Sequence, residues 1–322
     1  VGMDLSAGAI AVATERCQRS GADRVTFHNV SIYAVDQIPG EFDLINCVGV
    51  LHHMPDPIRG IQALSKKLKP GGILHIFVYA ELGRWEIQLT QEAIALLQGD
   101  RKGDYRDGVH VGRSLFSALP EENRLRKREE TRWALENHRD ECFADMYVHP
   151  QEVDYNVKTL CNLIDSSGLD FVGFSNPQYW DMSRLISDSP ELMERADGLG
   201  ERDRYRLTEI LDPEITHYEF FLSRPPLEKT DWVDDDVLLG AIPERHACIE
   251  GWPSRSFFNF DYQVVSITDE EFSFLEKCDP AQTQTVADIL EAVGLPGPDG
   301  VAMVRLLQSR QRFAALRQLL PC

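Results

Sequence analysis

Apolar and polar positions over the first 80 residues predict short strands that alternate with helices. Predicted strands lie at 1–5, 25–30, 42–50 and 73–79, with predicted helices at about 6–20 and 57–68. Ser6 is placed to cap the first helix, and the sequence LKPGG ends the second. The run at 42–50 is almost continuously apolar, as in a parallel strand covered on both faces. This pattern predicts an α/β fold with a doubly wound, Rossmann-like sheet.

Polar helical patterns interrupt the sheet further along the chain. Two insertions are expected, at 83–150 and 181–211. Between and after them, we expect a helix at 151–167 that Gly168 ends, then strands at 169–177 and 217–225. Residues 1–226 are therefore predicted to form one α/β domain with helical insertions.

The remaining chain predicts a polar linker, 227–263, and a small helical module, 264–322. Thr268 and Glu271 have the spacing of a capping box at the start of its first helix. A second helix is expected near Thr285 and a third over about 299–320. The module is similar to small winged-helix-like or three-helix units, and we expect it to dock a protein partner or to support a lid.

Composition and charge disfavour several classes of partner and binding site for this chain. The net charge of −19 disfavours nucleic acid as a partner, and the basic residues within 121–130 alternate with glutamates, as on a solvated helix face. No apolar run reaches the roughly 18 residues of a membrane span. The seven cysteines include no C-x-x-C pair, which disfavours a disulfide framework or a zinc site. With no leader before the first strand, we expect a cytoplasmic protein.

Polar side chains follow two of the predicted strands. Asp4 ends the first strand, where a carboxylate can accept hydrogen bonds from a ribose diol; alternatively it only precedes a capped helix. His52 and His53 follow the strand at 42–50, after Gly49. They either border a ligand or are ordinary loop histidines, one exposed and one hydrogen-bonded. A metal is not expected, because adjacent histidines cannot easily face one ion and no third ligand lies nearby.

The segments VGMDLS, VTFHNVSI, FDLINCVGVLHHMPDP and LKPGGILHIFVYA, in this order, resemble the class I S-adenosylmethionine-dependent methyltransferases over roughly residues 1–80. SSGLDFVGFSNP and HYEFFLSRP resemble the closing antiparallel hairpin of that fold. The resemblance implies S-adenosylmethionine as cofactor. It implies that Asp4 binds the ribose hydroxyls, that Leu5 packs on the adenine and that Ser31 lies beside the adenine amine. Cys47, Val48 and Gly49 would line the methionine portion.

The chain departs from that family in two ways. Ser31 stands where the family usually has Asp, and its hydrogen bond to the adenine amine is expected to be weaker. The strand and glycine-rich loop that usually open the family fold are absent, so we expect a chain that lacks the first βα unit, about 60–100 residues.

The resemblance also places the substrate. The loop with both histidines would border the substrate entrance, and His53 is the first candidate for a general base. The insertion 83–150 would form the substrate lid. It ends in CFADMYVHPQEVDY, a segment dense in hydrogen-bonding groups, where Asp145 and His149 are candidates for direct contact. The alternative for this segment is capping and surface polarity, with Asp154 capping the next helix.

The predicted function is S-adenosylmethionine-dependent methyl transfer to a small-molecule or peptide acceptor. One alternative is a catalytically silent, methyltransferase-like binding or regulatory module. Another is a nicotinamide-dependent oxidoreductase, which would need an upstream G-x-G-x-x-G turn and a motif such as Tyr-x-x-x-Lys; the sequence lacks the latter.

Overall fold

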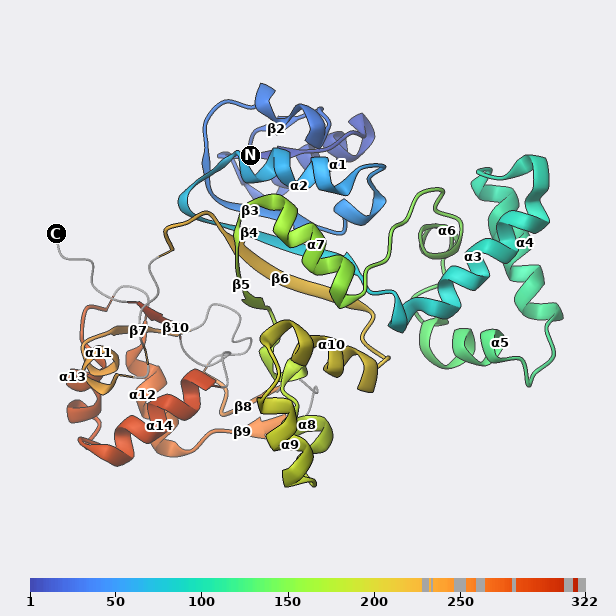
Figure 1. Cartoon of the computed structure of the whole chain (residues 1–322). Helices are drawn as coiled ribbons and strands as arrows, with labels where there is room; N and C mark the ends of the chain where they lie inside the picture. The colour runs from blue at the N-terminus through green and yellow to red at the C-terminus, as the bar shows by residue number, and fades with distance from the viewer. Residues whose placement is uncertain are drawn as a thin grey trace. The chain divides into compact units, whose positions relative to one another are not determined.

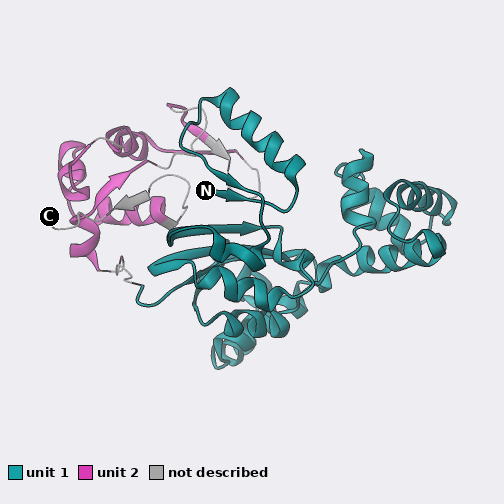
Figure 2. Ribbon diagram, turned by 90° about the horizontal axis from the view of Figure 1, so that it is seen from above, with its two compact units in different colours: residues 1–227 teal, residues 228–322 magenta. Residues whose placement is uncertain are grey.

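A computed structural model of the chain describes residues 1–227, 232, 234–245, 253–258, 264–279, 282–309 and 315–317 (Figure 1). The chain divides into two compact units, Val1–Leu227 and Glu228–Cys322 (Figure 2).

The first unit contains the expected α/β sheet. Its four-stranded sheet has the order β3 (Phe42–Val48), β4 (Leu68–Tyr79), β6 (His217–Ser223) and β5 (Asp170–Phe174). β3 runs parallel to β4, whereas β6 runs antiparallel to both β4 and β5, which confirms the closing hairpin. A separate parallel pair consists of β1 (Gly2–Met3) and β2 (Phe27–His28). Within the described residues, β3 pairs with a strand only on its β4 side.

Helices cover one face of the four-stranded sheet. α2 (Pro57–Ser65) and α7 (Val157–Ser167) pack on each other, and their apolar sides join a core with the alternate β4 residues Leu74, Ile76 and Val78, all 0% exposed. The next β4 residues, such as Phe77 and Tyr79, point to the other face and are only partly buried.

Capping interactions set several helix ends as expected. α1 (Ala7–Ser20) begins after Ser6, whose hydroxyl accepts from Ala9 N–H at 3.1 Å. α7 ends at Gly168, which has a positive φ of 70°. Between these core elements lie η1 (Ile32–Gln37) and η2 (Leu51–His53).

Two boundaries of the first unit differ from the sequence prediction. α2 ends at Ser65, and β4 already begins at Leu68, so LKPGG belongs to the strand, at an irregularity in the pairing with β3. α7 begins at Val157 rather than 151, because Asn156 forms a capping box with Thr159. Asp154 therefore does not cap this helix.

The segment before α7 is extended beside the end of β4. Tyr155 bridges to Ala80, and Val153 N–H donates to the His52 carbonyl at 2.8 Å. These hydrogen bonds keep residues 151–155 extended, although the sequence pattern predicted a helix there.

The insertion 83–150 is helical, as predicted. It contains η3 (Leu82–Arg84), α3 (Trp85–Gln98), η4 (Gly99–Arg101), α4 (Tyr105–Ala118), α5 (Arg124–Arg128), a π-helical turn η5 (Glu129–Trp133) and α6 (Asp140–Tyr147). Its helices bury a small core of their own, with Ile94, Phe143 and Tyr147. Gly112 permits this packing, since a Cβ there would lie 2.6 Å from the Phe143 ring. The second insertion forms η6 (Pro177–Trp180), α8 (Ser183–Ile186), α9 (Pro190–Asp197) and α10 (Glu201–Leu211).

The described part of the second unit contains helices and short strands. They are α11 (Asp235–Leu239), β7 (Ile242–Glu244), β8 (Ser256–Phe258), β9 (Val264–Ser266), α12 (Asp269–Lys277), α13 (Val286–Ala292), α14 (Pro298–Ser309) and β10 (Ala315–Arg317). The capping box of Thr268 and Glu271 is present at the start of α12, and α13 begins after Thr285.

Two predictions for this unit were wrong. The third helix ends at Ser309, and β10 follows it and pairs with β7. The predicted linker 227–263 contains α11, β7 and β8, because Leu238 and Ala241 are fully buried in the core of this unit. The rest of that linker lies outside the described residues.

Candidate active site

The carboxyl end of β1 presents Asp4 and Leu5 together. Ser6 N–H donates to Asp4 Oδ1 at 2.7 Å, and the Asn29 amide donates to the carbonyls of Asp4 and Leu5, both at 2.9 Å. Leu5 is 74% exposed beside this fixed carboxylate. The pair fits a ligand with a ribose diol next to an apolar ring. Ser31 caps η1, where its Oγ accepts from Tyr33 N–H and its own proton stays free to donate.

The carboxyl end of β3 is open at Gly49. Gly49 has a φ of +72°, and a Cβ there would meet no atom within 4 Å, so a ligand can approach this backbone closely. Val48 is 45% exposed beside it. Cys47 differs, because its side chain lies in the core beneath the sheet and burial raises the pKa of its thiol to about 12. Only the Cys47 backbone lies near this edge.

Four rings stack next to this edge. His52 packs on Tyr79 (3.9 Å between centroids) and on His53 (4.2 Å), and His53 packs on His149 (4.0 Å). Arg84 covers the Tyr79 ring at 3.5 Å. His52 is 0% exposed and neither ring nitrogen has a partner; burial lowers its pKa to about 3, so it is neutral. His53 is half-buried, so neither histidine is the exposed loop residue of the alternative interpretation.

His53 has a defined tautomer when it is neutral. Its Nδ1 lies 3.0 Å from the carbonyl oxygen of Gln151, which can only accept, so Nδ1 carries the proton and Nε2 carries the free lone pair. Burial, together with His149, lowers the pKa of His53. The ring is thus a proton acceptor at neutral pH.

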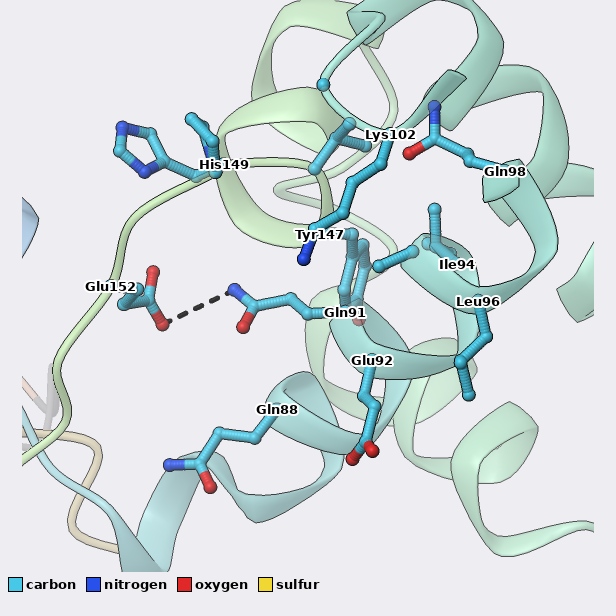
Figure 3. A pocket seen from close by; sticks show the side chains of 14 residues that line it. Gln88, Gln91, Glu92, Ile94, Leu96, Gln98, Lys102, Tyr147, His149 and Glu152 are labelled. Carbon is cyan, nitrogen blue, oxygen red and sulfur yellow. Dashed lines mark hydrogen bonds between the residues drawn. The ribbon is translucent and has the colours of Figure 1, made fainter. Parts of the chain in front are cut away.

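A cavity of about 480 Å³ opens where β4 ends and β6 begins. It is lined by side chains of β4, of the start of β6 and of the helical insertion, among them Phe77, Tyr79, Arg84, Trp133, Asp145 and His217. Of the three predicted catalytic residues, only Asp145 lines it. His149 lines a different cavity of about 520 Å³ beside α3 (Figure 3), and His53 lines neither.

His217, Tyr79 and Arg84 were missed by the sequence interpretation. Tyr79 and His217 are paired in the β4–β6 register, and His217 stacks on Phe77 at 4.6 Å. Burial lowers the pKa of His217, so its ring is neutral at pH 7. The signal that could have found His217 is its place at the first position of a strand antiparallel to β4.

The described part of the chain holds no group of three or more His, Cys, Asp or Glu side chains placed to bind a metal ion. Within the same residues, no helix has both the length and the apolar character needed to cross a bilayer.

Comparisons with known proteins agree with this architecture. A family model for a methyltransferase domain matches residues 1–74. An uncharacterized protein of Synechococcus sp. is 59% identical over 312 residues, 96% of this chain and 74% of that protein. A ubiquinone biosynthesis O-methyltransferase of Methylococcus capsulatus is 40% identical over 73 residues, 22% of this chain and 30% of that enzyme.

A solved structure has the same fold over both units. PKMT2 from Rickettsia typhi, in complex with AdoHcy, aligns with a TM-score of 0.67 at 14% sequence identity, over 99% of this chain and 67% of that chain. The chain therefore spans only part of each of these relatives, and less than a third of the O-methyltransferase.

Proposed function

We propose that the chain is a class I S-adenosylmethionine-dependent methyltransferase, and that it methylates a small-molecule or peptide acceptor bound in the 480 Å³ cavity. One observation carries the choice of this cavity. Gly49, predicted to border the methionine portion, donates its N–H to the Phe77 carbonyl at 3.3 Å, and Phe77 lines the cavity. The cofactor and acceptor positions would then lie side by side at the carboxyl ends of β3 and β4.

Each of the proposed cofactor-binding residues would contact a different part of the cofactor. Asp4 would accept hydrogen bonds from the ribose, Leu5 would cover the adenine, and Ser31 would bond the adenine amine. Val48 and the open backbone at Gly49 would lie along the methionine portion. When bound, S-adenosylmethionine supplies an electrophilic methyl group for in-line displacement, so the chain itself has to align the acceptor and exclude water.

The proposed acceptor side has two groups that can take up a proton. Asp145, predicted from the sequence, and the neutral ring of His217 both line the cavity. His53 lies behind Tyr79 in the ring stack, so its role would be to position that ring rather than to contact the acceptor. His149 would act through His53 in the same way.

Calorimetry with S-adenosylmethionine tests the proposal, using the protein as its gene encodes it. We expect saturable binding that weakens about 10-fold or more in Asp4→Ala, because the ribose would lose hydrogen bonds to a charged acceptor. Asp23→Ala is the matched control, since Asp23 is exposed in the turn between α1 and β2, away from the carboxyl end of the strands. Binding should be unchanged in that variant.

Three results would decide the matter. Binding that Asp4→Ala weakens supports the cofactor assignment. A well-folded protein that does not bind S-adenosylmethionine would overturn the proposal. Cofactor binding without methyl transfer to any amine, hydroxyl or peptide in a broad acceptor screen would favour the catalytically silent alternative. The docking of a protein partner by 264–322 stays a prediction that a separate pull-down would have to test.

A further inference from the structure

Two histidines hold the backbone of Gln151, at the point where the helical insertion returns to the sheet. His53 Nδ1 donates to the Gln151 carbonyl oxygen at 3.0 Å, and the Gln151 N–H donates to His149 Nδ1 at 3.2 Å. The two rings also pack on each other, with 4.0 Å between their centroids. His53 belongs to η2, after β3, whereas His149 follows α6 of the insertion. We call these three residues the histidine clasp.

The histidine clasp joins the insertion to the sheet beside the acceptor cavity. On one side of it, the chain continues along η2, where the Val153 N–H donates to the His52 carbonyl at 2.8 Å. On its other side lies α6, which lines the acceptor cavity with Cys142, Asp145 and Met146. Release of the clasp would therefore free the end of the helix that forms one wall of this cavity.

The two hydrogen bonds require opposite tautomers in the two rings. The Gln151 carbonyl oxygen can only accept, so His53 carries a proton on Nδ1. The Gln151 N–H can only donate, so Nδ1 of His149 carries a lone pair and its Nε2 carries the proton. A second proton on His149 has to go to Nδ1, where it would face the Gln151 N–H. Protonation thus turns an acceptor into a donor and breaks this hydrogen bond.

The groups around the clasp oppose a positive charge on His53. Burial lowers the pKa of His53, and the charges of His149 and Arg84 lower it further. The Gln151 carbonyl and the Asp145 carboxyl group act in the opposite direction, but the pKa remains lowered. The closed clasp therefore binds a proton less readily than an open one, in which the rings reach water.

The other ionisable neighbours of the ring stack add little compensating charge in mild acid. Burial lowers the pKa of His52 to about 3 and raises that of Tyr79, so both rings are neutral. Glu152 is paired with Arg84. Burial and Glu152 raise the pKa of Asp154 to about 6, so this carboxyl group loses its charge in the same range. If both clasp rings were protonated, two like charges would lie about 4.0 Å apart.

We propose that the histidine clasp is a pH-sensitive switch, which holds the helical insertion on the sheet at neutral pH and releases it in mild acid. The pKa of His53 is lowered from 6.5 in the closed state. Its contribution to closure is therefore fully present above pH 6.5 and is lost as the pH falls through the lowered value. The effect of release on turnover rests on the proposed function, but release itself can be measured without cofactor or acceptor.

Hydrogen–deuterium exchange of the whole protein, followed by peptide mass spectrometry, tests the inference. Protection factors over residues 149–155, corrected for the intrinsic pH dependence of exchange, are compared at pH 7.5 and pH 5. We expect the wild-type protein to lose protection there by about 10-fold or more at pH 5, which corresponds to a shift of one pKa unit in the clasp.

Two asparagine variants remove the titrating ring and keep the hydrogen bond. In His149→Asn the amide oxygen can accept from the Gln151 N–H, and in His53→Asn the amide N–H can donate to the Gln151 carbonyl. Neither amide takes up a proton, so residues 149–155 should lose less protection at pH 5 in both variants. The control is His110→Asn, because His110 is an exposed histidine on α4 of the same insertion; this variant should behave like wild type.

Wild-type protection that is equal at the two pH values would overturn the inference, and so would an equal loss in wild type and His149→Asn. If the asparagine variants do not fold, the ring tautomers of the wild type provide the test. Nitrogen-resolved NMR spectra at pH 7.5 should show His149 protonated on Nε2 and His53 on Nδ1. A proton on Nδ1 of neutral His149 would overturn the inference.

S-adenosylmethionine binding, measured on the same protein, keeps the two proposals apart. Cofactor binding together with pH-independent exchange over residues 149–155 defeats the switch alone. A pH-dependent clasp in a protein that does not bind the cofactor defeats only the proposed function.

Discussion

The guanidinium of Arg84 lies 3.5 Å from the centre of the Tyr79 ring while it donates to Glu152 at 3.1 Å. Its side chain is only 5% exposed. One residue therefore closes the stack of His149, His53, His52 and Tyr79 and also pairs with the buried Glu152 carboxylate. Removing it should disturb both features at once.

Arg84→Gln should lower the free energy of unfolding by about 3–5 kcal/mol, because the buried Glu152 carboxylate would lose its charged partner. Urea denaturation measures this loss. Arg84→Lys should recover only part of it, since an ammonium cannot stack on the ring as a planar guanidinium does. The control is Arg195→Gln, which breaks an exposed pair with Glu191 and should leave stability unchanged. Equal stability of Arg84→Gln and wild type would contradict the buried ion pair.

His52 should make the protein sensitive to acid. Its pKa is lowered from 6.5 to about 3, so the unfolded chain binds this proton more readily than the folded chain. The stabilisation by neutral His52 is fully present above pH 6.5 and falls as the pH drops toward 3, with a loss of about 2 kcal/mol at pH 5. His52→Phe keeps a ring against Tyr79 and should show a smaller loss. The melting temperatures of wild type and His52→Phe at pH 7.5 and at pH 5 measure this loss of stability. An equal drop in melting temperature for the two proteins would refute the prediction.

Asp154 should have the opposite pH dependence. Its pKa is raised from 3.8 to about 6, so its contribution to stability is fully present below pH 3.8 and is lost as the pH rises through 6. Asp154→Asn resembles the protonated state and should gain stability over wild type above pH 6, by up to about 3 kcal/mol. Denaturant titrations at pH 5 and 8 test this. The exposed Asp188→Asn serves as control and should follow the wild-type profile. A constant difference at both pH values would argue against the raised pKa.

Gly83 should tolerate no side chain. A Cβ there would lie 1.9 Å from the Ile215 carbonyl oxygen, and both backbones border the acceptor cavity through Arg84 and Thr216. Gly83→Ala should lower the free energy of unfolding by about 3 kcal/mol or more, because backbone has to move. Gly8→Ala is the matched control: Gly8 is exposed in α1 and its Cβ would meet only Ser6 Oγ at 3.6 Å. Gly8→Ala should raise the free energy of unfolding by about 0.5–1 kcal/mol, because Ala has the higher helix propensity. Thermal melts of both variants test the close approach of Gly83 to the Ile215 backbone. A Gly83→Ala protein as stable as wild type would contradict it.

Local features could be predicted because local interactions produce them. Ser6 and Thr268 cap their helices through bonds to N–H groups three residues on, and Gly168 ends α7 through its own positive φ. The start of α7 could not be predicted this way. Residues 151–155 are compatible with a helix, but their hydrogen bonds go to His52 and Tyr79, distant in sequence, so the chain stays extended there.

The candidate site also combines features that the local sequence predicts with features that depend on the tertiary structure. The strand ends carrying Asp4 and Gly49, and the polar density around Asp145, are visible in the amino-acid order, because a strand end needs only the residues of that strand. The neighbours of those residues are not. His217 reaches the cavity through the antiparallel register of β6 with β4, and Arg84 meets Glu152 because the insertion folds back on the segment before α7. Contacts of this kind join segments far apart in the chain, 68 residues for Arg84 and Glu152, so only the folded structure could bring them together.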